Sequence, residues 1–573
     1  MRHGRNGATM AGTRTTDQVR SAAHCEGNVV ALSRAVRPVL PVVALSGVLA
    51  LVACTAPGGS ADGTSPGGST EGIVLADGYE LGGYNPVAGF GAAGEAKMYD
   101  GLVRLTGGEG MPGFEPALAA ELPTANEDAT VWTVKIRPGV TFSDGSTFGP
   151  EDVVATYEAI LDPASASEAR SSFDMIEEVV QVGDDTVELH LAYSYAPLLT
   201  KMLIGIVPSE AVATPGLAAD SALNTAPVGT GPYTLVDLSP DRAVLEANED
   251  YWDGAPEVKR LTLLYVPDDN TRAQRMASGE IDGTNLPPLL ANTFEGKDGT
   301  TVTAHTSADW RGLSLPTDNP VSGDPAVRMA LNLAANRQSM IDDVLGGHGR
   351  VAATPIPEVY GDAYEPGAVF AYDPARAEQI LTEAGWVVGP DGIRVKDGQR
   401  AQIALMYNSV DTVRRDLAQA FASDALAVGV EVDLEALSWD RIDPRINTDS
   451  TLLGGGDEPF DPDTQAYGAL SSVFVQPDVG SIYDNPSDYQ DATVDAALEV
   501  GRRSLDQAER DAAYRQVQDA YIDDPGYVYL VFLDHTYVSK DAGWTMSGPV
   551  LEPHAHGVTW GPWWSLQSWT RDR

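Results

Sequence analysis

Residues 131–163 read VWTVKIRPGVTFSDGSTFGPEDVVATYEAILDP and carry the clearest fold signal in the chain. Trp132 to Arg137 alternates apolar and polar side chains at a period of two, which predicts a strand with one buried face. Pro138-Gly139 predicts a turn after that strand. Pro150 and the two acids that follow it open a segment with helical apolar spacing, which predicts an amphipathic helix. The stretch therefore predicts strand, turn and helix in succession, as in an α/β protein.

The rest of the body has the same mixture of short elements. Strands are predicted at 187–191, 261–266, 403–407, 430–434 and 527–532, and helices at 271–278, 328–344, 374–384, 414–427, 494–504 and 507–522. No clean series of strand–helix–strand units runs through this order. That favours several lobes with mixed sheets over one doubly wound sheet.

Length and charge limit the possible functions. The 573 residues suffice for three or four domains' worth of core. A formal net charge of −45 argues against binding to nucleic acid or to anionic lipid, and is typical of a soluble extracytoplasmic protein. Only two cysteines occur, Cys25 and Cys54, so a disulfide-stapled secreted scaffold is excluded.

The N-terminus predicts export. Residues 39–53 (VLPVVALSGVLALVA) are apolar and follow two arginines, but the run is shorter than the roughly 20 residues that span a bilayer. This pattern predicts a signal peptide over residues 1–53. The polar stretch 1–33 is long for a signal, which favours a true translation start near Val29 or Val30.

The tetrapeptide Leu51-Val52-Ala53-Cys54 resembles a bacterial lipobox, in which the cysteine is acylated and becomes the first residue. Acyl chains on Cys54 would hold the protein at the outer face of the cell membrane. Residues 55–72 are rich in Gly, Ser, Thr and Pro, which is typical of a flexible tether. We therefore expect a lipidated cysteine and linker over residues 54–72.

Seven blocks further along carry a family resemblance. They are YDGLVRL (99–105), PALAAEL (116–122), the stretch 131–163, APVGTGPYTL (226–235), ANEDYWDGAPEVKRLTLLYVPDDNTRAQRMASGEIDG (247–283), GDPAVRMALNLAANRQSMI (323–341) and RDLAQAFASDALAVGVEVDLEAL (415–437). Together they resemble the substrate-binding proteins of peptide and nickel ABC importers, which are the extracellular solute-binding proteins of family 5. The resemblance runs from about residue 73 to the C-terminus.

This resemblance implies a periplasmic-binding-protein-like (type II) α/β fold with three lobes, mixed sheets and a hinged ligand cleft. Lobe I would comprise 73–95, 225–315 and 541–573, lobe II would be the insert 96–224, and lobe III would be 316–540. The protein would capture peptides by closing the cleft and deliver them to a membrane permease and its ATPase. We expect a monomer with no cofactor and no enzymatic activity.

In the peptide-binding members an acidic residue pairs with the α-ammonium of the ligand. The matching segment here is LLGGGDEPFDPDTQAY (452–467), and alignment on its Asp-Pro pair places Glu458 at the acid, with Asp457 beside it and Phe460 in the same loop. A desolvated ammonium needs such a partner. The family's tryptophan position is Gly455 in this chain. The alternative interpretation of Glu458 is a solvated loop acid.

Other residues are candidates for the cleft. Trp310 and Arg311 end a predicted strand, where Arg could hold a carboxylate and Trp could form a flat wall. Ordinary packing with a surface ion pair is the alternative. Tyr84 and Asn85 match an early segment of the family that approaches the ligand.

A metal-chelate receptor of the same family is the second interpretation, because Glu458 to Pro462 (EPFDP) also resembles the nickel branch. That branch favours a histidine, whereas this chain has none between His348 and His535, and the relevant position falls near Asp478. The pair His554 and His556 is weak evidence by itself, so no metal ligand is assigned.

An extracytoplasmic hydrolase is the alternative from another functional class. The chain lacks G-x-S-x-G, H-E-x-x-H and P-loop motifs, although its many carboxylates leave a glycosidase-like pair open. The VGTGPY segment (228–233) leads into a strand and has no following Lys-Ser/Thr, so we interpret its glycines as structural. Four tryptophans at 560, 563, 564 and 569 are expected to close the core of the first lobe rather than to form a stacking platform.

Overall fold

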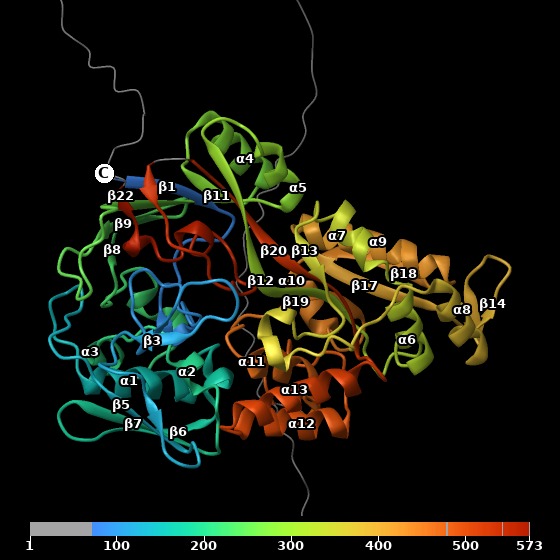
Figure 1. Cartoon of the computed structure of the whole chain (residues 1–573), viewed down its shortest axis with the longest axis horizontal. Helices are drawn as coiled ribbons and strands as arrows, with labels where there is room; N and C mark the ends of the chain where they lie inside the picture. Colours follow the sequence, from blue (N-terminus) through green and yellow to red (C-terminus); the bar gives the residue numbers. More distant parts are fainter. Residues whose placement is uncertain (1–71, 477–478, 541–542, 572–573) are drawn as a thin grey trace, which may run out of the picture. The chain divides into compact units, whose positions relative to one another are not determined.

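The computed structural model describes residues 72–571 apart from 477–478 and 541–542 (Figure 1). The predicted signal peptide, Cys54 and nearly all of the predicted linker lie outside these residues. No helix in the described part is long and apolar enough to cross a membrane.

The main feature is an eleven-stranded mixed sheet in the order β18-β17-β19-β12-β20-β11-β1-β10-β9-β8, with β13 also pairing with β20. Its strands are β1 (Gly72–Asp77), β8 (Tyr233–Ser239), β9 (Arg242–Ala247), β10 (Arg260–Tyr265), β11 (Gly283–Asn285), β12 (Thr300–Ser314), β13 (Gly349–Val351), β17 (Gln402–Asn408), β18 (Glu431–Leu437), β19 (Ser450–Gly455) and β20 (Tyr527–Lys540). Parallel and antiparallel pairs coexist, so the predicted mixed α/β class is confirmed.

The two longest strands, β12 and β20, connect the two ends of this sheet (Figure 1). One end of their antiparallel pair adjoins β11 and the other adjoins β19 and β13. Their register breaks between Thr306 and Trp310. This irregularity gives the long pair a natural point of bending. The prediction that a strand ends at Trp310-Arg311 is wrong, because β12 continues to Ser314.

A separate antiparallel sheet comprises β4 (Thr124–Ala125), β5 (Val131–Lys135), β7 (Thr186–Leu191) and β6 (Ile176–Gln181). The predicted strand at 132–137 is therefore β5, and the predicted helix is α1 (Pro150–Leu161). Pro150 occupies the first turn of α1, and Asp152 accepts a hydrogen bond from the Gly149 amide at 2.8 Å. The short helix α2 (Leu198–Lys201) follows this sheet.

The remaining helices are α3 (Ser209–Val212), α4 (Asp269–Ser278), α5 (Pro288–Ala291), α6 (Pro325–Ala334), α7 (Arg337–Asp343), α8 (Pro374–Glu383), α9 (Thr412–Ala427), α10 (Trp439–Ile442), α11 (Pro462–Leu470), α12 (Ala492–Arg503) and α13 (Gln507–Tyr521). Short strands are β2 (Val103–Leu105), β3 (Phe114–Pro116), β14 (Val387–Val388), β15 (Arg394–Lys396), β16 (Gln399–Arg400), β21 (Trp544–Thr545) and β22 (Thr570–Arg571).

One predicted helix is two helices. The pattern at 328–344 predicts a continuous helix, but α6 ends before Ala335, which is extended (ψ 115°), and α7 begins after Asn336. The Asn336 side chain accepts a hydrogen bond from the Ser339 amide and so caps α7. Asparagine competes for backbone donors in this way and favours helix starts over helix interiors.

Three of the four C-terminal tryptophans fill the core, as their clustering predicts, and Trp564 is partly buried against it. Trp560, Trp563 and Trp569 are each at most 4% exposed and belong to the cluster that also contains Tyr537 of β20. The glycines of VGTGPY are also structural. A Cβ on Gly231 would lie 2.4 Å from the carbonyl carbon of Met98, so only glycine allows the two backbones to approach.

Candidate functional site: a cleft between the two sheets

A cavity of about 750 Å³ lies between the segment that follows the four-stranded sheet and the β19–α11 region of the large sheet. Its aromatic wall residues are Tyr193, Tyr195, Trp310, Trp439, Tyr467, Phe474, Tyr483 and Tyr527. Its charged wall residues are Asp174, Lys201, Arg414, Asp457, Glu458, Asp463, Asp484, Arg502 and Arg503. Aromatic surface interspersed with charged groups is typical of a ligand-binding cleft.

Glycines at the end of β19 shape one side of the cavity. A Cβ on Gly455 would lie 2.5 Å from the Trp310 ring, so the indole packs directly on this glycine. Gly456 has a φ of +104°, a backbone conformation that glycine adopts without strain. Trp310 also packs edge-on against Tyr529, with 4.9 Å between ring centroids. Gly455 thus leaves room for Trp310 on the cavity wall.

The loop after β19 places the two predicted acids on the wall. Asp457 is exposed, and Glu458 is partly buried. The Glu458 carboxylate forms an ion pair with the ammonium of Lys201, and the side chains are 16% and 6% exposed. Lys201 belongs to α2, so this pair joins the two sides of the cavity. No local sequence pattern marks Lys201, so it was not among the predicted residues.

A second contact region beside the cavity centres on Arg502 of α12. Its guanidinium lies 3.5 Å from the centroid of the Tyr467 ring and 5.3 Å from that of Tyr195. Its Nε lies 3.5 Å from a carboxylate oxygen of Asp463. Burial raises the pKa of Asp463 to about 6, despite the opposing effect of Arg502. The Arg502 carbonyl also accepts a hydrogen bond from the Ala196 amide at 2.9 Å, which again connects the two sides.

Arg311 does not face the cavity. It is 2% exposed, and its guanidinium is paired with the carboxylate of Asp309 in the irregular part of β12. His554 contacts the same carboxylate at 2.7 Å. Burial by itself would raise the pKa of Asp309, but the Arg311 guanidinium and His554 outweigh it and hold that pKa well below its usual range. Arg311 is therefore buried and paired with Asp309, and it is not part of the cavity wall where a ligand carboxylate would lie.

Asp309 belongs to a buried network in which His535 of β20 is central. His535 Nε2 lies 3.1 Å from Asp309, and its Nδ1 lies 2.9 Å from Glu552. Burial lowers the pKa of His535, but these two carboxylates outweigh that effect and raise it. The Glu552 carboxylate also accepts a hydrogen bond from the Gly561 amide at 3.0 Å. The network thus ties the C-terminal segment to the middle of the β12–β20 pair.

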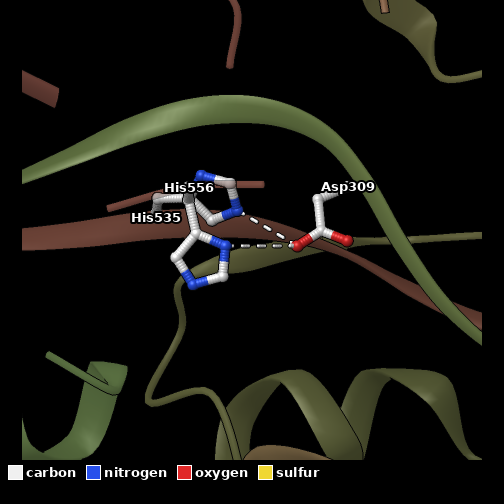
Figure 2. A group of neighbouring side chains, drawn as sticks. All are labelled: Asp309, His535 and His556. Atoms are coloured by element: carbon white, nitrogen blue, oxygen red, sulfur yellow. Dashed lines mark hydrogen bonds and ion pairs between the residues drawn. The ribbon is translucent and has the colours of Figure 1, made fainter. Parts of the chain in front are cut away.

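Figure 2 shows His535 and His556 directed toward Asp309. One ligand atom from each of the three lies within 4.8 Å of the others, which is a spacing compatible with a metal ion. However, the His556 Nδ1 that lies 3.9 Å from Asp309 also donates a hydrogen bond to the His554 carbonyl at 2.8 Å, so it carries a proton and offers no free lone pair to a metal. Arg311 already neutralises Asp309. These contacts favour a hydrogen-bonded ion network over a metal centre.

Three other predicted residues lie away from the cavity wall. The Asn85 side chain is buried, accepts a hydrogen bond from the Val87 amide at 3.1 Å and so caps a short 3₁₀ turn. Tyr84 is 6% exposed and packs edge-on against Phe90. Phe460 is 3% exposed and lies against Trp560 in the core. The structure therefore brings together Asp457, Glu458 and Trp310 of the predicted set.

Tyr193, Tyr195, Lys201, Arg414 and Arg502 line the cavity but were not predicted. They come from three distant parts of the chain, and their types are common on any surface. A weak signal existed for the first two, since the run YSY interrupts the apolar pattern after β7. Asp478, which the nickel comparison singles out, lies outside the described residues.

Comparisons with known proteins agree with this architecture. Residues 113–475 match the family model described as bacterial extracellular solute-binding proteins, family 5 Middle. Protein XP55 of Streptomyces lividans is 42% identical over 492 residues, covering 85% of this chain and 88% of that protein.

Two solved structures share the fold. NikZ from Campylobacter jejuni in complex with Ni(L-His) superposes with a TM-score of 0.78 at 26% identity, covering 88% of this chain and 100% of that one. AppA of Bacillus subtilis in complex with a nonapeptide has a TM-score of 0.73 at 22% identity and covers 87% and 99% of the two chains. The fold is thus α/β and periplasmic-binding-protein-like. The chain belongs to the bacterial extracellular solute-binding proteins of family 5.

Proposed function

We propose that this protein is the substrate receptor of an ABC importer and that its ligand is a peptide. The observation that carries this proposal is the cavity of about 750 Å³, whose wall combines aromatic rings with the carboxylates of Asp457 and Glu458. The resemblance to peptide-binding proteins implies that the loop with these two acids supplies the partner of the ligand's α-ammonium. A carboxylate in a partly buried site stabilises an ammonium strongly.

The proposed lobes are those of the sequence prediction: lobe I (73–95, 225–315 and 541–573), lobe II (96–224) and lobe III (316–540). The β12–β20 pair would act as the hinge, because it runs through both parts of the large sheet and has a register break. Closure would enclose the peptide between lobes II and III. The ligand shifts the population toward the closed form, which the permease and ATPase would recognise.

We also propose the location. Acylation at Cys54 would tether the receptor to the outer face of the cell membrane through the 55–72 linker, and the soluble body would act there as a monomer. Family membership supports an extracytoplasmic role.

A metal chelate is the second candidate ligand, because the NikZ complex holds Ni(L-His) and resembles this fold with a TM-score of 0.78. His554 lines the cavity here. Its Nδ1 lies 2.7 Å from Asp309 and its Nε2 lies 3.5 Å from Arg414. Both ring nitrogens are thus engaged, which favours the peptide.

Native mass spectrometry of protein purified without refolding tests the proposal. We expect ligand masses that co-purify with the protein and fragment as peptides. The protein should release these peptides intact. A retained nickel chelate would favour the second candidate. Cleavage of an added peptide by the purified protein would point to a hydrolase and contradict the proposal.

A further inference from the structure

We infer that Lys201 and Glu458 form a latch that holds the empty cleft shut, with the Lys201 ammonium in the place that a ligand's ammonium would take. The second half of this inference rests on the proposed function. The latch itself rests only on where the two residues lie.

The two partners lie on opposite sides of the cavity, next to different sheets. Lys201 ends α2, directly after the four-stranded sheet, and Glu458 lies in the loop that leaves β19 of the large sheet. Their side chains are 6% and 16% exposed, so solvent screens the charges weakly. The pair is therefore a charged, largely desolvated contact across the cavity.

The backbone of each partner is held by contacts on its own side of the cavity. The Tyr157 hydroxyl donates a hydrogen bond to the Lys201 carbonyl at 3.1 Å, and the Lys201 ammonium lies 5.7 Å from the centroid of the Phe173 ring. On the other side, the Thr464 hydroxyl donates a hydrogen bond to the Glu458 carbonyl. In the same loop, the Arg510 guanidinium donates to both carboxylate oxygens of Asp461, at 2.6 and 2.7 Å. These contacts fix the backbone that carries each partner, so little backbone freedom is lost when the two side chains pair.

Neutral contacts cross at the same place. The Ala196 amide donates to the Arg502 carbonyl at 2.9 Å, and the Ser194 hydroxyl donates to the Arg503 carbonyl at 2.6 Å. The second of these is exposed, so water can replace it at small cost. The Lys201–Glu458 pair behaves differently, because a buried charge that loses its partner is strongly destabilised unless it reaches water. The two charges can therefore separate only when the cleft opens and admits water, which couples the ion pair to opening.

The latch has a consequence for ligand selection. A ligand with a free ammonium must compete with Lys201 for one carboxylate, so its apparent affinity is its intrinsic affinity multiplied by the fraction of molecules that are unlatched. Lys201→Met removes the competitor and leaves Glu458 for the ligand. We expect this variant to bind trialanine about tenfold more tightly than the wild type.

Small-angle X-ray scattering of ligand-free protein decides whether the latch exists. A compact chain of about 500 residues has a radius of gyration of about 23 Å. We expect Lys201→Met and Glu458→Gln each to raise it by about 1 Å through hinge opening, and the charge swap K201E/E458K to restore the wild-type value. Lys259→Met is the matched control, because it removes an exposed lysine whose partner Glu249 is 66% exposed.

Wild-type scattering from both single variants would overturn the latch. Circular dichroism reports whether each variant is folded, and if a single variant unfolds, the swap variant decides: a compact swap supports the latch and an expanded swap contradicts it. The trialanine titration separates the two proposals. Failure of both the wild type and Lys201→Met to bind trialanine would count against the peptide proposal, whereas the scattering result stands by itself.

Discussion

The lowered pKa of His556 predicts that the folded protein loses stability in mild acid. Burial, and next the charge of His535, lower the pKa of His556 from 6.5 to about 3 in the folded protein. On acidification the unfolded chain therefore binds this proton first. The neutral imidazole contributes stability at neutral pH, and that contribution is lost as the pH falls from 6.5 toward 3.

The magnitude follows from the two pKa values. A pKa of 6.5 in the unfolded chain and of about 3 in the folded protein corresponds to about 2 kcal/mol lost between neutral pH and pH 5. The His556 side chain retains 23% exposure. Solvent screening reduces the expected loss to about 1–2 kcal/mol.

The His556→Phe variant isolates this contribution. Phenylalanine keeps a ring that can stack on His535, 4.1 Å away, and meet the edge of Tyr79 at 6.3 Å, but it takes no proton. The variant also loses the hydrogen bond from Nδ1 to the His554 carbonyl. That loss of about 1 kcal/mol is the same at both pH values and cancels in the comparison.

Urea unfolding near pH 7 and near pH 5 is the assay. We expect the wild type to lose about 1–2 kcal/mol more than His556→Phe between the two pH values. His535 acts with the opposite sign: its pKa is raised, so its contribution is present below 6.5 and is lost as the pH rises through its folded-state value. Because His535 is present in both the wild type and His556→Phe, its contribution cancels in the comparison. Equal losses of stability in the two proteins would refute the reasoning.

Three further predictions test the cleft and the anchor. Glu458→Gln should weaken trialanine binding by about 2–5 kcal/mol in calorimetry, because it removes a carboxylate partner of the ammonium; unchanged affinity would dismiss Glu458 as the anchor. Gly455→Ala should destabilise the protein by about 1–3 kcal/mol and shift its tryptophan fluorescence, because the new Cβ would lie 2.5 Å from the Trp310 ring. Wild-type unfolding and emission would show that the ring is not packed there. Cys54→Ser should move the protein from the membrane fraction to the soluble fraction of cells, and retention in the membrane fraction would contradict lipid anchoring.

Local sequence pattern predicted the elements whose causes are local. The strand β5, the helix α1 and the long helices α12 and α13 lie within a few residues of their predicted bounds. Periodicity works for them because each element buries one face against a neighbour. The pattern failed at Asn336, where a single side-chain cap interrupts an otherwise continuous helical signal.

The loop that resembles the family's ligand-binding segment, residues 452–467, predicted part of the cavity wall. Asp457 and Glu458 lie on the cavity wall because the loop after β19 has its own sequence signature, and Trp310 lies there because Gly455 leaves room for it. Tyr84, Asn85 and Phe460 were equally plausible from the sequence. Whether such residues face a cavity or a core depends on how the loops pack, which no local pattern encodes.

By itself the sequence determined the α/β class, the family and the position of an acidic loop, since each is written in contiguous residues. Only the tertiary structure decided that Lys201 meets Glu458, and that Asp309 meets His535 and Glu552. The physical reason is that an ion pair depends on distances of a few ångströms between groups. Those distances are set by the pairing of β12 with β20 and by the return of the C-terminal segment, both of which join residues more than 200 positions apart.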